Sequence, residues 1–266
     1  MKKLLVIAVC LGFIISSTAA YAAPVGNIAT PSLLKKGLII KDEQSQYGVI
    51  AGGEVDLNWD RKLKNQVDDT EYYFYGGKIG ILLMDRFIPY TVLGAAEAKK
   101  QNFKVGAYEV EWKTDYDFVW AVGGTALIYS TQPGQLGEGV LSFGVDGRYR
   151  QSHLSVDAVK LNGINYDHGS SSLTNSKYEL GEWQIAGELA YQYKQIIPYF
   201  GVKYSDASGE AEATINSRKY KNDFEGKDNV GIFAGGDIAI NDSFTANIEG
   251  RFLDETALSI AANFRF

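Results

Sequence analysis

Apolar and polar residues alternate along run after run of this chain, and no other feature of the sequence constrains its fold as strongly. In residues 46–59, Val55 and Leu57 share one parity, while Glu54 and Asp56 share the other. Successive side chains of a β-strand point to opposite faces, so a period of two predicts strands with one apolar and one polar face. The end of the chain alternates in the same way, so we expect a strand there rather than a frayed terminus.

The alternating runs are separated by connectors that tend to switch between long polar segments and short turns such as Met84–Phe87. Bacterial outer-membrane barrels have an even number of strands, short periplasmic turns and longer outer loops. We therefore expect an all-β fold, a closed antiparallel transmembrane β-barrel of about twelve strands, with ten to fourteen compatible. The predicted strands cover 46–59, 71–83, 88–98, 103–113, 118–129, 139–150, 154–164, 178–193, 196–205, 229–240, 244–253 and 256–266.

Lipid contact explains why the terminal strand is needed. Backbone N–H and C=O groups in a bilayer must pair within the protein, so the last strand has to close on the first. Aromatic residues near strand ends suit the two membrane interfaces, although the same residues could pack the core of a soluble β-sandwich. A sandwich, however, does not need polar residues along every second face of all its strands. The predicted interface aromatics are Trp59, Tyr73, Tyr75, Tyr90, Trp112, Phe118, Tyr149, Tyr191, Tyr193, Phe244, Phe252, Phe264 and Phe266.

The first 23 residues have the pattern of a secretory signal peptide, with Lys2 and Lys3 before a short apolar run and a small-x-small site ending at Ala22. We expect three parts: a signal peptide at 1–23, a periplasmic or lumenal segment at 24–44, and a transmembrane β-barrel at 45–266. Cys10 is the one cysteine, so the mature chain should have no disulfide and no cysteine-ligated metal. The formal charge of −6 argues against nucleic-acid binding.

The predicted inward faces carry many charges, which must pair with one another or meet water. A wet lumen with an acidic excess favours cations, as rings of Asp and Glu do. The alternative is a plugged barrel whose charges form internal ion pairs, as in small barrels. The predicted pore-lining residues are the acidic Glu54, Asp56, Glu97, Glu109, Glu111, Asp146, Asp157, Glu188, Asp237 and Glu249, and the basic Lys78, Arg148, Arg150, Lys203, Arg251 and Arg265.

Little in the sequence indicates catalysis. His153 falls in a predicted periplasmic turn beside Ser152 and Ser155, and His168 lies beside Asp167 in a predicted outer loop. Adjacency in sequence does not make a nucleophile–base pair, because geometry defines such a pair. We predict no enzyme activity, no cofactor and no metal site. A barrel hydrolase that depends on His168 is the alternative.

Two terminal segments resemble the chlamydial major outer membrane protein family, whose members are porins. The N-terminal match comprises Pro24, Val25, Gly26, Asn27, Pro31, Ser32 and Leu33, followed by Asp60, Arg61, Leu63 and Lys64. The C-terminal match comprises Arg251, Leu253, Asp254, Glu255, Asn263, Phe264, Arg265 and Phe266. The chain departs from the family in the lack of cysteines in its mature part and in its shorter length, so the disulfide-crosslinked envelope role should not be carried over.

The resemblance implies a pore and a homotrimer in the bacterial outer membrane. We expect passive diffusion of small hydrophilic solutes and ions through a polar, mildly cation-preferring lumen. The alternative is a structural or adhesive barrel with a plugged lumen and ligand-binding surface loops, such as the polar segment 206–228. Expected partners are outer-membrane lipid and the barrel-assembly machinery, because Phe266 resembles the C-terminal signal that this machinery reads.

Overall fold

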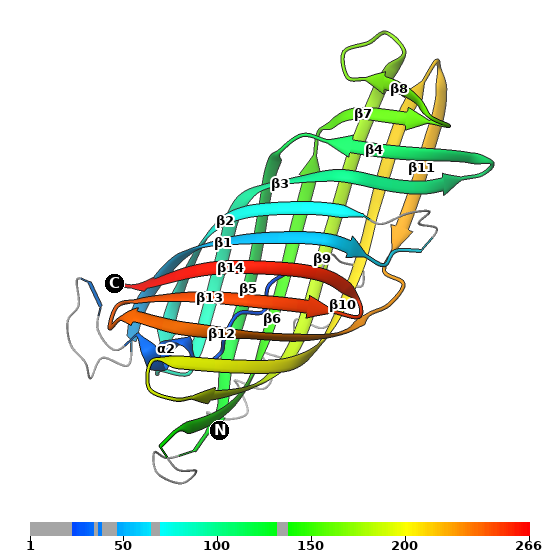
Figure 1. Cartoon of the computed structure of the whole chain (residues 1–266). Helices are drawn as coiled ribbons and strands as arrows, with labels where there is room; N and C mark the ends of the chain where they lie inside the picture. The colour runs from blue at the N-terminus through cyan, green and yellow to red at the C-terminus, as the bar shows by residue number, and fades with distance from the viewer. Residues whose placement is uncertain (1–22, 35–36, 39–46, 65–69, 132–137) are drawn as a thin grey trace, which may run out of the picture.

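Fourteen strands form one continuous antiparallel sheet in the computed structural model of this chain, which describes residues 23–34, 37–38, 47–64, 70–131 and 138–266 (Figure 1). The predicted signal peptide lies outside the described residues, apart from Ala23. The elements are α2 (Thr30–Leu33), β1 (Tyr47–Arg61), β2 (Glu71–Leu83), β3 (Phe87–Val105), β4 (Tyr108–Thr114), β5 (Asp117–Ser130), β6 (Val140–Leu154), β7 (Val156–Leu161), β8 (Ile164–Asp167), β9 (Leu173–Gln192), β10 (Ile196–Ile215), β11 (Arg218–Glu225), β12 (Val230–Asn241), β13 (Phe244–Phe252) and β14 (Glu255–Arg265).

Ten of these strands close into a barrel. The order around the wall is β1, β2, β3, β5, β6, β9, β10, β12, β13 and β14, and β14 returns to pair with β1. That closing ladder runs from Ile50 opposite Arg265 to Arg61 opposite Glu255. The expected closed antiparallel barrel and its terminal strand are confirmed, and the wall has ten strands, the lower limit of the predicted range.

The strands predicted at 103–113 and 154–164 do not belong to the barrel wall. They correspond mainly to β4 and β7, which pair with each other beyond the barrel. Their antiparallel ladder continues, in the same register, the ladder that β5 and β6 form within the wall. The segment 206–228, expected as a solvated loop, forms the distal part of β10 and all of β11. Alternating sequence alone does not tell where a strand leaves the membrane, so sequence reasoning counted these extensions as wall strands or loops.

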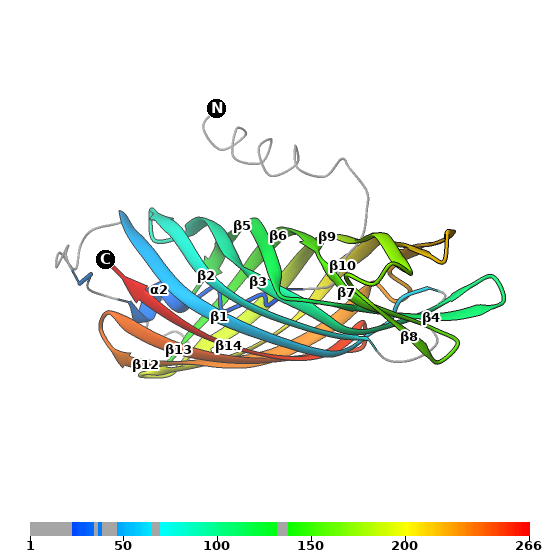
Figure 2. The ribbon, with the colours of Figure 1, turned by 90° about the horizontal axis from the view of Figure 1, so that it is seen from above.

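Together β4, β7, β8, β11 and the distal ends of β3, β9 and β10 form a region that we call the head. It lies at the end of the barrel opposite the C-terminus (Figures 1 and 2). Its apolar core contains Phe103, which stacks on Phe224 at 5.1 Å between ring centroids, and Tyr178, which stacks on Phe224 at 5.5 Å. Trp112, expected at a membrane interface, is 0% exposed in this core.

The turn between β2 and β3 reverses the predicted facing of β3. Leu83 pairs with Phe87, so the turn has three residues, and two of them have positive φ. A four-residue turn was expected, and a shift of one residue moves every side chain to the other face. Glu97 therefore points outward rather than into the lumen, and Tyr90 lies inside at 5% exposure rather than at a membrane interface.

Both ends of the barrel sequence lie at one end of the cylinder, which we call the terminal end. Tyr47 there pairs with Leu83, and the last residue, Phe266, donates its backbone N–H to the Val49 carbonyl at 2.8 Å. The sequence predicted that the long connector after β5 lies on the outer side. In the structure, β5 begins at the head and ends at the terminal end. His153 lies within β6 near the head instead of in a turn.

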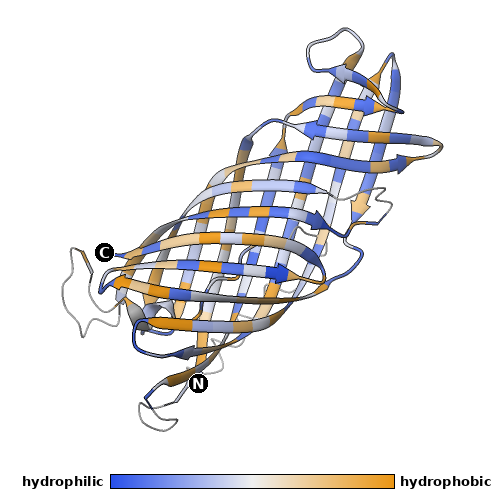
Figure 3. Cartoon of the chain, in the orientation of Figure 1, coloured by the Kyte–Doolittle hydropathy of each residue, from blue (hydrophilic) through white to orange (hydrophobic). Residues whose placement is uncertain are grey.

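The outer face of the wall is apolar, and hydrophobic residues alternate with polar ones along the barrel strands (Figure 3). Side chains such as Ile79, Phe200 and Ile248 are more than half exposed on this face, where lipid would cover them. Most of the predicted interface aromatics are on it too, including Trp59, at 41% exposure. Among the described residues, no helix has the length and apolar character required to cross a bilayer.

Candidate functional site

The lumen of the barrel is the candidate site, because the inward faces of eight wall strands bring ionisable side chains together there. Of the predicted pore-lining residues, Lys78 is half-buried in the lumen and the others that lie there are at most 6% exposed. The predicted residues found in the lumen are Glu54, Asp56, Lys78, Asp146, Arg148, Arg150, Glu188, Lys203, Asp237, Glu249, Arg251 and Arg265. Their role in lining a pore stays a prediction.

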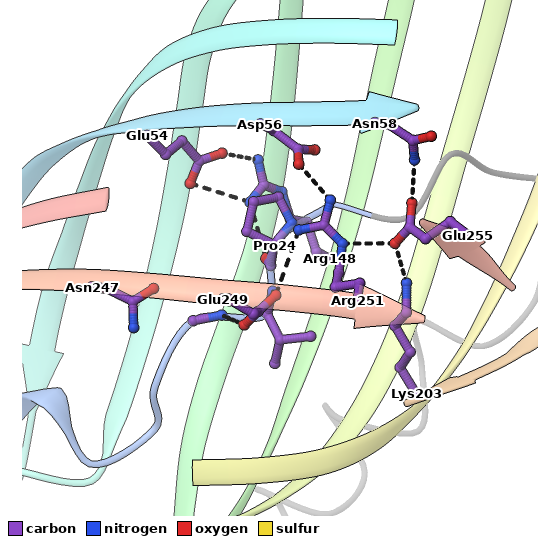
Figure 4. A network of polar contacts seen from close by, with 12 residues as sticks. Pro24, Glu54, Asp56, Asn58, Arg148, Lys203, Asn247, Glu249, Arg251 and Glu255 are labelled. Atoms are coloured by element: carbon purple, nitrogen blue, oxygen red, sulfur yellow. Dashed lines mark hydrogen bonds and ion pairs between the residues drawn. The ribbon is translucent and has the colours of Figure 1, made fainter. Parts of the chain in front are cut away.

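One group of these side chains lies nearer the terminal end, and we call it the proximal level. Arg148 on β6 reaches across to Glu54 on β1 with two nitrogens, one of them at 3.3 Å from the carboxylate (Figure 4). The hydroxyl of Tyr90 donates to Asp146 at 3.0 Å, and the ammonium of Lys78 lies 3.9 Å from the centre of the Tyr90 ring. These contacts join strands on different sides of the barrel through its interior.

A second group lies one inward position closer to the head, and we call it the distal level. Arg251 on β13 donates through Nε to Glu255 at 2.7 Å and through Nη2 to Asp56 (Figure 4). Lys203 on β10 forms ion pairs with Glu255 and, at 3.0 Å, with Asp254. The guanidinium groups and carboxylates alternate here, so each buried charge meets opposite charges, as burial requires.

Arg150 and Arg61 extend the distal level on either side. Arg150 donates to Glu182 on β9 at 2.7 Å, and its guanidinium lies 5.0 Å from the Tyr72 ring centre. Arg61 forms an ion pair with Asp254 at 2.7 Å. The distal level therefore crosses the whole lumen just below the apolar core of the head.

Four functional residues at the distal level were missed by sequence reasoning: Arg61, Glu182, Asp254 and Glu255. Glu182 has the same parity as Glu188 on the same strand, so the alternation could have revealed it. Asp254 and Glu255 were counted in a turn, although β14 already begins at Glu255. Arg61 follows a β-bulge near Trp59 in β1, which shifts the parity and turns Arg61 inward.

Four predicted pore-lining residues lie outside the lumen. Glu97 is on the outer face of β3, because the three-residue turn before this strand reverses the facing of its side chains. Glu109 is exposed on β4, where Glu111 forms an ion pair with Lys160 at 3.5 Å. Asp157 on β7 forms an ion pair with Lys113 at 3.2 Å. These last three belong to the head, because 103–113 and 154–164 do not enter the barrel wall.

The described part of the N-terminal segment, residues 23–34, runs inside the terminal half of the lumen. The carboxylate of Glu249 accepts the backbone N–H groups of Val25 at 3.1 Å and Gly26 at 3.0 Å. Glu188 accepts the backbone N–H of Ile28 at 3.3 Å. The segment thus supplies main-chain donors to carboxylates of the lumen wall.

Two cavities flank this segment. One of about 50 Å³ lies between it and the wall and is bordered by Glu54, Lys78 and Asp237. The other, of about 320 Å³, opens toward the terminal end and is bordered by Ile28, Pro31 and Arg265, among others. The lumen in this structure is therefore filled by the segment and by ion pairs, with small spaces left beside the segment.

The geometry gives no support to a hydrolase. The Ser155 hydroxyl donates to Asp117 at 2.8 Å rather than to His153. The backbone N–H of His168 donates to the Asp157 carbonyl at 2.7 Å, at an exposed turn of the head. In the described residues, no cluster of three or more His, Cys, Asp or Glu side chains could hold a metal ion.

Comparison with known proteins gives full-length similarity to one group. The chain is 21% identical to the major outer membrane porin of Chlamydia psittaci and 22% identical to that of Chlamydia trachomatis serovar B, over 100% of both chains in each case. A major outer membrane porin of Chlamydia pneumoniae is 20% identical over 74% of this chain and 71% of its own length. The alignment with the Chlamydia psittaci protein extends over 399 positions, so that relative carries additional segments. No protein-family profile matches the chain.

Solved structures with a similar course of the chain include other outer-membrane barrels. The outer membrane protein OprG of Pseudomonas aeruginosa aligns at a TM-score of 0.37 and 12% identity, covering 84% of this chain and 96% of its own. The outer membrane protease OmpT of Escherichia coli aligns at 0.39 and 9% identity, covering 82% of this chain and 91% of its own.

Proposed function

We propose, for an outer-membrane protein that resembles the chlamydial major outer membrane porins over its whole length, that its barrel is a channel for small hydrophilic solutes and ions, which pass by passive diffusion. The supporting observation is the lumen wall, which carries ionisable side chains on eight strands. Apolar side chains of similar size often stabilise a core better than buried ion pairs do. Stability alone therefore gives no reason for this charged interior, whereas a hydrated pathway does.

We propose a mild preference for cations. The described buried residues of the lumen include nine carboxylates, against six arginine and lysine side chains and the half-buried Lys78. The acidic side chains are Glu54, Asp56, Asp146, Glu182, Glu188, Asp237, Glu249, Asp254 and Glu255, and the basic ones are Arg61, Arg148, Arg150, Lys203, Arg251 and Arg265. An acidic excess raises the local concentration of cations.

Lipid surrounds the outer face of the barrel, and three further features belong to the proposal. The signal peptide is removed near Ala23, so that residues 24–44 form a segment separate from the barrel at 45–266. Phe266 is read by the barrel-assembly machinery, and the chain forms a homotrimer, as its resemblance to the chlamydial family implies. No nucleic acid, cofactor or covalent step takes part in this function.

Conductance in planar bilayers tests whether the barrel is a channel. The substitution Glu188→Gln tests whether the channel prefers cations. Glu188 hydrogen-bonds a backbone N–H, and no described cation forms an ion pair with it, so at a pH at which this buried carboxyl is ionised the substitution removes charge without breaking an ion pair. We expect the cation-to-anion permeability ratio to fall by up to about fivefold, the factor given by about 1 kcal/mol of charge interaction in water. Glu111→Gln in the head is the matched control and should leave the ratio unchanged. An unchanged ratio in Glu188→Gln contradicts the proposed cation preference.

The filled lumen favours a second candidate, a structural or adhesive barrel whose head binds a ligand at the cell surface. In that case, folded protein gives silent bilayers whatever the state of residues 23–34. Substitutions at exposed residues of β11, such as Lys219→Ala, would then abolish surface binding without changing the fold. Steady ion currents from folded protein would exclude this candidate as the main function.

A further inference from the structure

The segment at residues 23–34 has no charged side chain, although it lies in a lumen lined with charges. We propose that it is a displaceable plug, and that the terminal half of the lumen is a binding site for a peptide with uncharged side chains, which this segment occupies in cis. The gating part of this proposal rests on the proposed channel function, whereas the peptide site does not.

The wall recognises the segment mainly through its backbone. Gly26 has a φ of +72°, and it follows Val25, so two consecutive N–H groups turn toward one carboxylate, that of Glu249. Successive N–H groups in such a turn form a concave anion site. Because the anion here is a side chain of the wall, the turn fastens the segment to β13.

Further contacts hold the segment on both sides. The Thr30 hydroxyl donates to Asp237 on β12, and Asn27 donates to the Ile197 carbonyl at 3.3 Å. On the acceptor side, Arg148 donates to the Pro24 carbonyl at 3.4 Å and Arg265 to the Leu34 carbonyl at 2.8 Å. The wall therefore presents donors and acceptors along the whole path of the segment, including its short helix α2.

Apolar contacts also hold the segment, in which Val25, Ile28 and Leu34 are at most 2% exposed. Val25 and Ala29 pack against a small cluster that includes Tyr199 and Phe233, and Leu34 packs against Ile50. The described residues of the segment form no β-ladder with any wall strand. The segment can consequently leave without breaking the sheet, and the cavities of about 50 and 320 Å³ beside it provide room for movement.

Departure of the segment would uncover carboxylates at the lumen entrance. Glu188, Asp237 and Glu249 would lose the hydrogen bonds that they now accept from N–H and O–H groups of the segment. Glu188 Oε2 already has no hydrogen-bond partner among the described atoms. Three carboxylates would then face the opening at the terminal end. The vacated site thus becomes an acidic vestibule that attracts cations, in keeping with the proposed preference.

Binding of a peptide in trans tests the site without relying on conductance. The chain is expressed without residues 23–34, and a fluorescent peptide with the sequence APVGNIATPSLL is titrated against the purified, folded barrel. We expect saturable binding to this variant, at least tenfold weaker binding to the intact chain, and loss of binding by a peptide with proline at the positions of Val25 and Gly26. A deletion variant that folds but binds the two peptides equally overturns the site.

A disulfide lock tests displacement in the full chain, which has no cysteine after Cys10. A Cβ at Gly144 on β6 would lie 3.3 Å from the Cβ of Ile28, close to the ~3.5–4.5 Å of disulfides, and 2.5 Å from the Ala126 carbonyl oxygen, so the wall must shift locally to accept the cysteine. The Ile28→Cys/Gly144→Cys variant should be closed to ions when oxidised and should regain, on reduction, the current of the Gly144→Cys variant. Ile28→Cys alone, treated with the same oxidant, is the control.

The outcomes separate the two proposals. Equal currents from the oxidised and reduced lock overturn the plug while leaving the channel in place. Peptide binding by the deletion variant, with no current from any variant, supports the peptide site and overturns the channel. Larger, steadier current from the deletion variant than from the wild type supports both.

Discussion

A buried charge in this lumen is stabilised by the number of its partners rather than by any one pair. Arg251 illustrates this, because its guanidinium contacts Asp56, Glu249 and Glu255 and is 0% exposed. Removing one member of such a group leaves the others buried without compensation. Ion pairs in the exposed part of the molecule lack this penalty, because water replaces the lost partner.

Arg251→Met should lower the free energy of unfolding by about 3–5 kcal/mol, since Asp56 and Glu255 would stay buried beside an uncharged side chain. Lys64→Met is the control, because Lys64 and its partner Glu225 are both more than half exposed, and it should leave the free energy of unfolding nearly unchanged. Urea denaturation in detergent micelles measures both. Equal losses for the two variants would contradict the picture of a dry, interdependent network.

At the scale of elements, the periodicity predicted most strands, whereas the turns determined which way a strand faces. Ten of the predicted strands became wall strands because alternation is a local property. The facing of β3 depended on one residue in the Met84–Arg86 turn, where positive φ at Met84 and Asp85 makes a tight connection that the residue types do not announce. The separation of β4 and β7 from the wall depends on where neighbouring strands end, which is not local.

In the candidate site, too, local features could be predicted from the sequence and non-local ones could not. Alternation within correctly placed strands identified Glu54, Arg148 and Glu249 as inward. It could not identify which charges meet, because Arg148 and Glu54 are 94 residues apart in the chain. It also missed the main-chain donors of residues 23–34, since a backbone N–H leaves no mark in the sequence.

Cross-strand pairs in the head give a prediction for pH. Glu210 on β10 lies between Lys177 on β9 at 2.6 Å and Lys221 on β11 at 2.7 Å, and hydrogen bonds from both lower its pKa to about 2. Because the folded pKa lies below the ordinary 4.5, this carboxylate stabilises the head above that value, and the contribution is lost as the pH falls toward 2. Lys177→Met should raise the pKa of Glu210 toward 4.5, as measured by carboxyl NMR titration. A Glu210 pKa that stays near 2 in this variant would show that Lys177 is not the cause.

As a whole molecule, the protein is closed at both ends by different means. At the terminal end, the segment at residues 23–34 fills the lumen through hydrogen bonds and a few apolar contacts. At the other end, the head covers the distal level with a packed apolar core around Phe103, Tyr178 and Phe224. In the proposed channel, a solute must pass both, and the described residues of the segment at the terminal end form no β-ladder with the wall that would have to break.

Phe224→Ala should open a cavity in the head core and destabilise the head by about 3–5 kcal/mol, while the barrel remains folded. Limited trypsin digestion should then cut first near Arg218 and Lys219 at the β10–β11 turn. Phe200→Ala is the control, since Phe200 is 62% exposed on the lipid-facing wall. Cleavage that begins in the barrel strands would contradict an independently loosened head.

The two longest strands carry a mechanical consequence. β9 and β10 each run for 20 residues, about 66 Å at ~3.3 Å per residue, whereas the apolar band of such barrels is about 25 Å tall. Their ladder is continuous from the bilayer into the head, apart from one irregularity near Ala213. A pull on the tip of the head would therefore be transmitted along these two strands into the barrel wall.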